Sequence, residues 1–171
     1  MLRPSVVASL VLVPTMCSIA AGQQRTQPGK ASPPGNEITV NISSTIGKYS
    51  YQASGRGTCG HAADASIHGT SAALWVVQYG SGKGKIRRLD LTLWRPKDGD
   101  GDQLSLSLEI GSNSHRIVTG SGGESAGEGT VTILPSGPGG RLEVSGKEAS
   151  GKAIRLSIDC SAFADVPAEG E

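Results

Sequence analysis

One segment of the chain matches a known catalytic motif: residues 123–127 read Gly-Glu-Ser-Ala-Gly. In carboxylesterases, Gly-x-Ser-x-Gly places a nucleophilic serine on a sharp turn between a strand and a helix. Here the segment is Gly- and Ser-rich and leads into a predicted strand, and no histidine follows Ser125, although that fold places its histidine last. We therefore predict a loop and no catalytic residues. A secreted serine hydrolase using Ser125 with His61, His68 or His115 is the alternative.

A run of acidic residues could bind calcium. Asp98, Asp100 and Asp102 alternate with glycines, which is the spacing of the first ligands in an EF-hand loop. The sixth position of that loop needs glycine for its sharp turn, but this chain has Gln103 there. The pattern therefore favours a polar hairpin tip, with a weak Ca²⁺ site at the three aspartates as the alternative.

A second group of possible metal ligands consists of His61, Asp64 and His68, which lie within eight residues of one another. Structural metal sites usually need four protein ligands, and the sequence offers no distant fourth one here. We predict a solvated loop at this place, and no cofactor for the protein.

Trp94 is the strongest candidate for a ligand-binding residue. The leucines of residues 89–93 occupy odd positions, so Trp94 falls on the opposite strand face with Arg88 and Asp90. An indole with a cation and a carboxylate on a solvent-facing side could stack on a sugar ring or dock a protein. We predict that Trp94, Arg88 and Asp90 form this site, for a glycan or an envelope protein. The alternative is a solvent-facing strand with a covered tryptophan. Trp75 is predicted to lie in the core.

The elements that must position these residues are β-strands. From residue 37 onward apolar and polar residues alternate with a period of two, most clearly at 89–93, 104–110 and 154–160. Clusters rich in Gly, Ser and Asp separate these runs, as in tight turns. We predict an all-β fold, an antiparallel β-sandwich of about nine short strands over residues 37–162, with a barrel as the alternative. Residues 163–171 are predicted to be a C-terminal tail.

Cys59 and Cys160 are predicted to form one disulfide. Two cysteines in an exported domain most simply pair with each other, because an oxidising compartment lets the bond persist. Cys160 continues the alternation of Ile154, Leu156 and Ile158, which places it on a buried face. Two separate buried thiols are the alternative.

The N-terminal end has the features of a signal peptide, predicted over residues 1–22. Arg3 supplies a positive charge, residues 6–13 are apolar, and small residues follow. The apolar run is far shorter than the ~20 residues that span a bilayer, and no later segment is apolar enough. We therefore predict no transmembrane segment. Residues 23–36, rich in Pro, Gly and polar side chains, are predicted to be a flexible linker.

This leader predicts a secreted or periplasmic protein, and its brevity and the linker indicate a bacterial one. A lipid anchor on Cys17 is the alternative, for which Met16 in the preceding position is a poor fit. The sixteen Lys and Arg residues nearly balance the fifteen Asp and Glu residues. A nucleic-acid-binding protein would carry a strongly basic face, so we predict no nucleic-acid partner.

The stretch from Gly127 to Cys160 consists of Gly-x-Gly-Thr-Val-Thr-Ile, a Gly-rich turn, Arg-Leu-Glu-Val-Ser-Gly-Lys-Glu-Ala-Ser-Gly and a closing strand. Together with the region of Cys59, it resembles the mycobacterial nineteen-kilodalton lipoprotein antigens. Those chains have a signal peptide, a polar linker and a small β-domain with one early cysteine and one in the last strand. The resemblance implies a surface or envelope protein without enzymatic activity, and it transfers no functional residues. This chain departs from the family at Met16.

We therefore predict an exported, non-enzymatic β-sandwich of the cell envelope or medium, which acts as a binding or structural surface module.

Overall fold

The computed structural model describes residues 38–67, 69–81, 83–120 and 125–167. The predicted signal peptide, the predicted linker and His68 lie outside the described residues. Within these residues there is no helix, and ten strands follow one another: β1 (Ile38–Ile46), β2 (Tyr49–Ile67), β3 (Thr70–Gly80), β4 (Ile86–Pro96), β5 (Gln103–Ile110), β6 (Asn113–Val118), β7 (Glu128–Ser136), β8 (Gly139–Lys147), β9 (Ala153–Cys160) and β10 (Ala164–Asp165).

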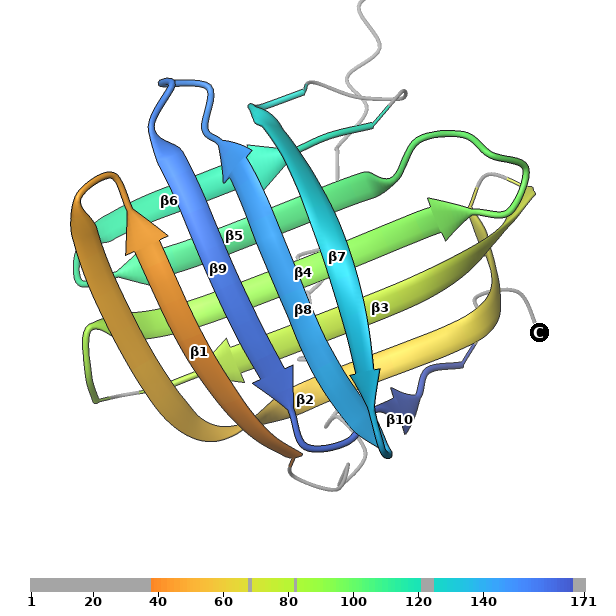
Figure 1. Ribbon diagram of the computed structural model, residues 1–171, viewed down its shortest axis with the longest axis horizontal. Helices are drawn as coiled ribbons and strands as arrows, with labels where there is room; N and C mark the ends of the chain where they lie inside the picture. Colours follow the sequence, from red (N-terminus) through yellow and green to blue (C-terminus); the bar gives the residue numbers. More distant parts are fainter. Residues whose placement is uncertain (1–37, 68, 82, 121–124, 168–171) are drawn as a thin grey trace, which may run out of the picture. The chain divides into compact units, whose positions relative to one another are not determined.

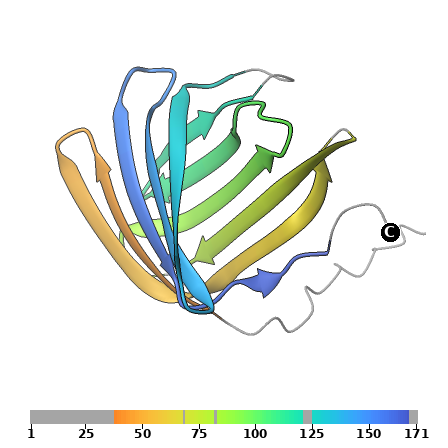
Figure 2. The ribbon, with the colours of Figure 1, turned by 45° about the vertical axis from the view of Figure 1, so that its right-hand side comes forward.

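Nine of the strands form one continuous antiparallel sheet in the order β6-β5-β4-β3-β2-β1-β9-β8-β7. The sheet curls into a half-barrel, so that β1, β9, β8 and β7 cross over β3, β4, β5 and β6 (Figures 1 and 2). The predicted all-β antiparallel class is confirmed. The sandwich is not confirmed, because the two halves are hydrogen-bonded into one sheet through β2 rather than forming two separate sheets.

The long strand β2 makes the curl. Its first half pairs with β1 and its second half pairs with β3, and Gly57 has a partner on both sides, Ile38 and Tyr79. A Cβ atom on Gly57 would lie 2.5 Å from the Gln78 carbonyl oxygen and 2.8 Å from a Val40 methyl carbon. Only glycine allows the backbones to approach this closely, which is typical of a bend at the corner of a curved sheet.

The concave side of the half-barrel holds the core. The leucines and isoleucines that alternate along β4, β5 and β9 all point into the curl and are buried. Each such side chain removed from water contributes about 1.5–3 kcal/mol, so this inner layer is the main source of stability. The predicted inward positions are therefore confirmed: Leu89, Leu91, Leu93, Leu104, Leu106, Leu108, Ile110, Ile154, Leu156 and Ile158.

The two ends of the sheet, β6 and β7, approach each other without forming a regular ladder. Val118 and Ala126 form an isolated bridge, with both N–H to O=C distances at 3.0 Å. Deeper in, a Cβ on Gly129 of β7 would touch Ile117 and Leu104 at 3.2 and 3.3 Å. Side chains and one bridge thus bring the sheet ends together.

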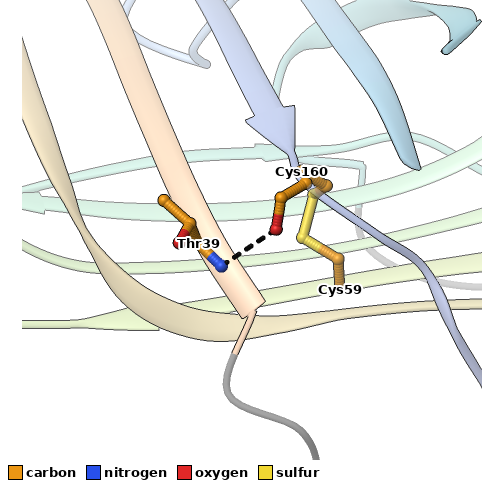
Figure 3. The surroundings of a disulfide bond; sticks show 4 residues. Thr39, Cys59 and Cys160 are labelled. Carbon is orange, nitrogen blue, oxygen red and sulfur yellow. Dashed lines mark hydrogen bonds between the residues drawn. A yellow bond between two sulfur atoms is a disulfide. The ribbon is translucent and has the colours of Figure 1, made fainter. Parts of the chain in front are cut away.

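The predicted disulfide is present. Cys59 of β2 and Cys160 at the end of β9 are both buried, with their Cα atoms 6.2 Å apart (Figure 3). The bond joins residues that are 101 positions apart in the sequence. It thereby links the second half of β2 to the last long strand, beside the start of β1.

The domain continues past residue 162, where the sequence predicts a tail. Phe163 N donates to the Pro138 carbonyl oxygen at 2.8 Å, and β10 pairs in parallel with β2 at Gly60 and His61. The Val166 side chain occupies the space that a Cβ on Gly60 would need. This segment extends the sheet beyond the point where the β1 pairing ends.

Candidate functional site

The predicted ligand-binding residues lie along the outer face of β4 but do not form one compact site. Trp94 is half-buried there, opposite Leu74 on β3 and Gln103 on β5. Arg88 is six residues away, which is about 20 Å along a strand. The sequence prediction that Trp94 sits beside Arg88 is therefore wrong: the period of two gives a shared face, but successive side chains on that face stand about 7 Å apart.

Arg88 and Asp90 form an ion pair with each other instead. Arg88 Nε donates to Asp90 Oδ2 at 2.5 Å, and the Arg88 side chain is largely exposed. The hydrogen bond to Asp90, reinforced by the carboxylate charge, raises the pKa of Arg88 above its ordinary value. The outer face of β4 thus offers an indole at one end and a neutralised ion pair toward the other.

Trp75 lies on the inner face, as predicted, but it is only half-buried. Its ring stacks on His61 with centroids 4.6 Å apart and an interplanar angle of 24°. The Arg95 guanidinium carbon lies 5.5 Å from the Trp75 ring centroid. The indole packs against the edge of the core, and a histidine and an arginine also contact it.

Arg95 connects the two halves of the curled sheet. Its Nε and Nη2 donate to the two carboxylate oxygens of Asp102 at 2.9 and 2.7 Å, and Nη2 also donates to the Val131 carbonyl oxygen of β7 at 3.1 Å. The hydrogen bond to Asp102 raises the pKa of Arg95, and partial burial opposes that rise. This arginine therefore fastens β4 to β7 across the open side.

Removing the Arg95 side chain should destabilise the fold more than removing an arginine that pairs only with a carboxylate on the neighbouring strand. Arg141 also forms a two-pronged pair, with Asp159, but both residues lie on the outer face of adjacent strands. We expect Arg95→Ala to lower the free energy of unfolding by about 1–2 kcal/mol, since it loses a carbonyl hydrogen bond and a ring contact as well. Arg141→Ala should cost clearly less than Arg95→Ala, because an ion pair exposed to solvent contributes little to stability. Urea unfolding measures both values, and equal costs would contradict the role given to Val131.

The three aspartates of the calcium hypothesis do not converge. Asp102 is held by Arg95, and Asp98 Oδ1 accepts a hydrogen bond from the backbone N–H of Asp100 at 3.2 Å. Among the residues that the structure describes, no group of three or more His, Cys, Asp or Glu side chains is placed to hold a metal ion. The Asp102 carboxylate is neutralised by the Arg95 guanidinium, an arrangement that agrees with the predicted polar hairpin tip.

Of the second group of possible metal ligands, the structure describes the side chains of His61 and Asp64, and it does not bring them together. His61 stacks on Trp75 inside the curl, whereas Asp64 is exposed and forms an ion pair with Lys97. The hydrogen bond from Lys97, and then its charge, lower the pKa of Asp64. The register of β2 shifts at a β-bulge between Ala62 and Ala65, and this bulge interrupts the regular alternation between His61 and Asp64.

Ser125 and His115 are not arranged as a catalytic pair. Ala126 bridges Val118 at the end of β6, which places Ser125 near that end. His115 precedes Val118 by three residues, so it lies about 10 Å along the strand from the bridge beside Ser125. A base must be within about 2.6–3.2 Å of its serine. The His115 Nδ1 atom is instead 2.5 Å from Glu148 Oε1, in a largely buried pair that joins β6 to the turn between β8 and β9.

A hollow at the other end of the half-barrel was missed from the sequence. It lies among the β1–β2 hairpin, the β8–β9 turn and the start of β6, and it measures roughly 340 Å³. Tyr49 and Tyr51 alternate just after the Gly47 turn, and from the sequence they indicate only a strand. The one sequence feature that could have indicated the hollow was an aromatic residue directly beside a turn. The residues lining the hollow are Ile46, Gly47, Lys48, Tyr49, Tyr51, Asn113, His115 and Lys152.

No protein-family model, curated protein or solved structure matches this chain. Within the described residues, no helix has the length and apolar character needed to cross a membrane.

Proposed function

We propose that this chain is an exported, non-enzymatic domain of the cell envelope or medium that acts as a binding or structural surface module. The observation that carries the proposal is the Cys59–Cys160 disulfide, which is buried and joins two strands far apart in the sequence. Disulfides of this structural kind persist in oxidising compartments and are rare in the cytosol. The predicted signal peptide at residues 1–22 agrees with such a location.

Binding is preferred to catalysis because of how the polar side chains are used. His115 is paired with Glu148, His61 is stacked on Trp75, and Ser125 lies about 10 Å from His115 by strand distance. This arrangement gives the serine hydrolase alternative little support. The resemblance to the mycobacterial lipoprotein antigens agrees with a surface role, and in this proposal the two halves of the curled sheet take the place of the two layers of a sandwich.

Two surfaces are available to a glycan or an envelope protein in this proposal. The outer face of β4 presents Trp94, with the Arg88–Asp90 ion pair farther along the strand. The end hollow presents Tyr49. Both offer an aromatic ring in contact with water, which is the feature that sugar rings and protein partners use.

The proposal is tested by expressing the full chain in a bacterial host and separating cytoplasm, periplasm, membrane and medium. We expect a processed protein in the periplasm or medium, with an N-terminus between Ala21 and Gln23 and with Cys59 and Cys160 linked in a non-reducing peptide map. An unprocessed cytoplasmic protein with free thiols would overturn export. A mature chain that begins at an acylated Cys17 would replace release by anchoring.

The same preparation tests the hydrolase alternative. A fluorophosphonate probe reacts with activated serines, and we expect no labelling above that of the Ser125→Ala variant. Labelling that disappears in Ser125→Ala would establish an activated serine and would contradict the non-enzymatic proposal.

A further inference from the structure

The hollow at the β1–β2 end of the half-barrel has the construction of a small ligand site. Three connections that are distant in the sequence surround it, namely the β1–β2 hairpin, the β8–β9 turn and the start of β6 (Figures 1 and 2). Gly47 N donates to the Ala153 carbonyl oxygen at 3.0 Å, and the largely buried His115–Glu148 pair holds β6 to the β8–β9 turn. Its volume of roughly 340 Å³ is within the range of small-molecule sites.

Aromatic rings distinguish this hollow. Tyr49 is 58% exposed, while Tyr51, two residues on and on the same strand face, is partly buried against the core. The Lys48 ammonium group lies 5.4 Å from the Tyr49 ring centroid. By contrast, four further hollows, lined mainly by residues of β1, β2, β7, β8 and β9, have no aromatic side chain among the described residues that line them. A tyrosine ring kept in water at the mouth of a hollow is a surface for stacking.

The charge of the hollow is positive. Lys48 and Lys152 line it, and none of the described lining residues is Asp or Glu. The nearby carboxylate of Glu148 is occupied, because one oxygen pairs with His115 and the other accepts a hydrogen bond from Ser150 Oγ at 2.9 Å. Two ammonium groups beside an exposed ring favour a ligand that carries negative charge.

Polar groups continue inward from the rings. Ser44 lies opposite Tyr51 in the β1–β2 register, on the inner face, and is 1% exposed. Its hydroxyl has no hydrogen-bond partner among the described residues. Ser44 does not line the hollow, and buried polar groups are ordinarily paired, so its hydroxyl marks a place for a bridging water behind Tyr51. At the rim, Asn113 supplies a further donor and acceptor.

We propose that this hollow binds an acidic sugar, a pyranose ring that carries a carboxylate or a phosphate. The Tyr49 ring would stack on the apolar face of the sugar, and Lys48 and Lys152 would bind the anionic group. Asn113 would bind ring hydroxyls. This inference rests on the proposed binding role and assigns that role a place and a ligand class.

The test uses the full mature protein and three probes by isothermal titration: a galacturonic acid tetramer, glucose 6-phosphate and neutral maltotetraose. We expect saturable binding of an acidic probe that weakens as salt rises, because the ammonium–anion attraction is screened. Maltotetraose should bind at least about tenfold more weakly, since one charged contact of about 1.4 kcal/mol changes a dissociation constant tenfold.

Variants locate the binding. Tyr49→Ala should weaken acidic-probe binding about tenfold, whereas Tyr49→Phe, which keeps the ring, should stay within about threefold of the wild type. Lys48→Ala with Lys152→Ala should remove the preference for acidic over neutral probes. Leu134→Ala and Lys147→Ala are matched controls, because they remove an exposed apolar side chain from β7 and an exposed cationic one from β8, neither of which lines the hollow. Both variants should leave binding unchanged.

Binding of the tetramer alone identifies a carboxylated sugar, and binding of glucose 6-phosphate alone identifies a phosphorylated one. No binding of either acidic probe by the folded protein overturns the inference, as does equal binding of maltotetraose. An unchanged affinity in Tyr49→Ala overturns the location. None of these failures would alter the export, processing and thiol measurements, so the proposed envelope role and the acidic-sugar site can fail separately.

Discussion

Replacing Cys59 and Cys160 together by alanine is expected to lower the free energy of unfolding by about 3–5 kcal/mol, the largest effect that we anticipate for this protein. The bond closes a loop between residues 101 positions apart. For a loop of about 100 residues, the lost entropy of the unfolded chain corresponds to roughly 4.7 kcal/mol, an upper-end value. Both sulfurs are also buried, so truncation leaves unfilled space beside β1.

Thermal unfolding of the wild type with and without dithiothreitol, beside the double variant, measures this effect. The melting temperature should fall by roughly 10 °C or more, given that each kcal/mol shifts it by several degrees in a domain of this size. The double variant should not respond to dithiothreitol, which serves as the internal control. A change of only one or two degrees would mean that contacts of β2, β1 and β9 alone hold this corner.

Gly139→Ala should be nearly as damaging, with an expected cost of about 3 kcal/mol, at the upper end of overpacking effects. Gly139 begins β8, where a Cβ atom would overlap the Cys160 carbonyl oxygen and lie 2.6 Å from the Ser161 carbonyl carbon. Both obstacles are backbone atoms. They cannot rotate away as a flexible side chain would, so β8 and the end of β9 must shift apart.

Gly101→Ala is the matched control for this substitution. Gly101 lies in the exposed turn between β4 and β5, and a Cβ there would meet nothing within 4 Å. Its cost should stay within about 0.5 kcal/mol, as for ordinary surface substitutions. Chemical denaturation gives both values. If Gly139→Ala matched Gly101→Ala in stability, the close approach of β8 to Cys160 would be contradicted.

The candidate site was only partly predictable, and the reason is visible in single residues. The face of Trp94 follows from counting along β4, and the structure places it on the outer face. Its neighbours could not be counted, because they belong to β3 and β5. Asp102 looked like a cation ligand beside Asp98 and Asp100. Its partner Arg95 lies on the preceding strand, and only the fold shows that this arginine also reaches β7.

The end hollow illustrates the same limit more strongly. Tyr49 begins β2, Asn113 begins β6 and Lys152 lies in the β8–β9 turn, and the three meet only because the sheet curls. In the sequence each of them marks an ordinary strand start or turn. A chemical grouping of this kind depends on the order of strands in the sheet, and local residue patterns do not reveal that order.

The amino-acid sequence by itself determined the nine strands of the main sheet, their inward faces and the cysteine pairing, but it did not predict β10. The strands and their faces follow from the alternation of neighbouring residues, and the pairing follows from the presence of just two cysteines after the predicted signal peptide. The tertiary structure alone decided that the strands form one curled sheet rather than two layers. That outcome depends on Gly57 having strand partners on both sides, and on the contacts of Arg95, His115 and Val118 that bring the sheet ends together. The Arg95–Val131 and His115–Glu148 contacts join residues 36 and 33 positions apart, and their energies exist only once the chain has folded.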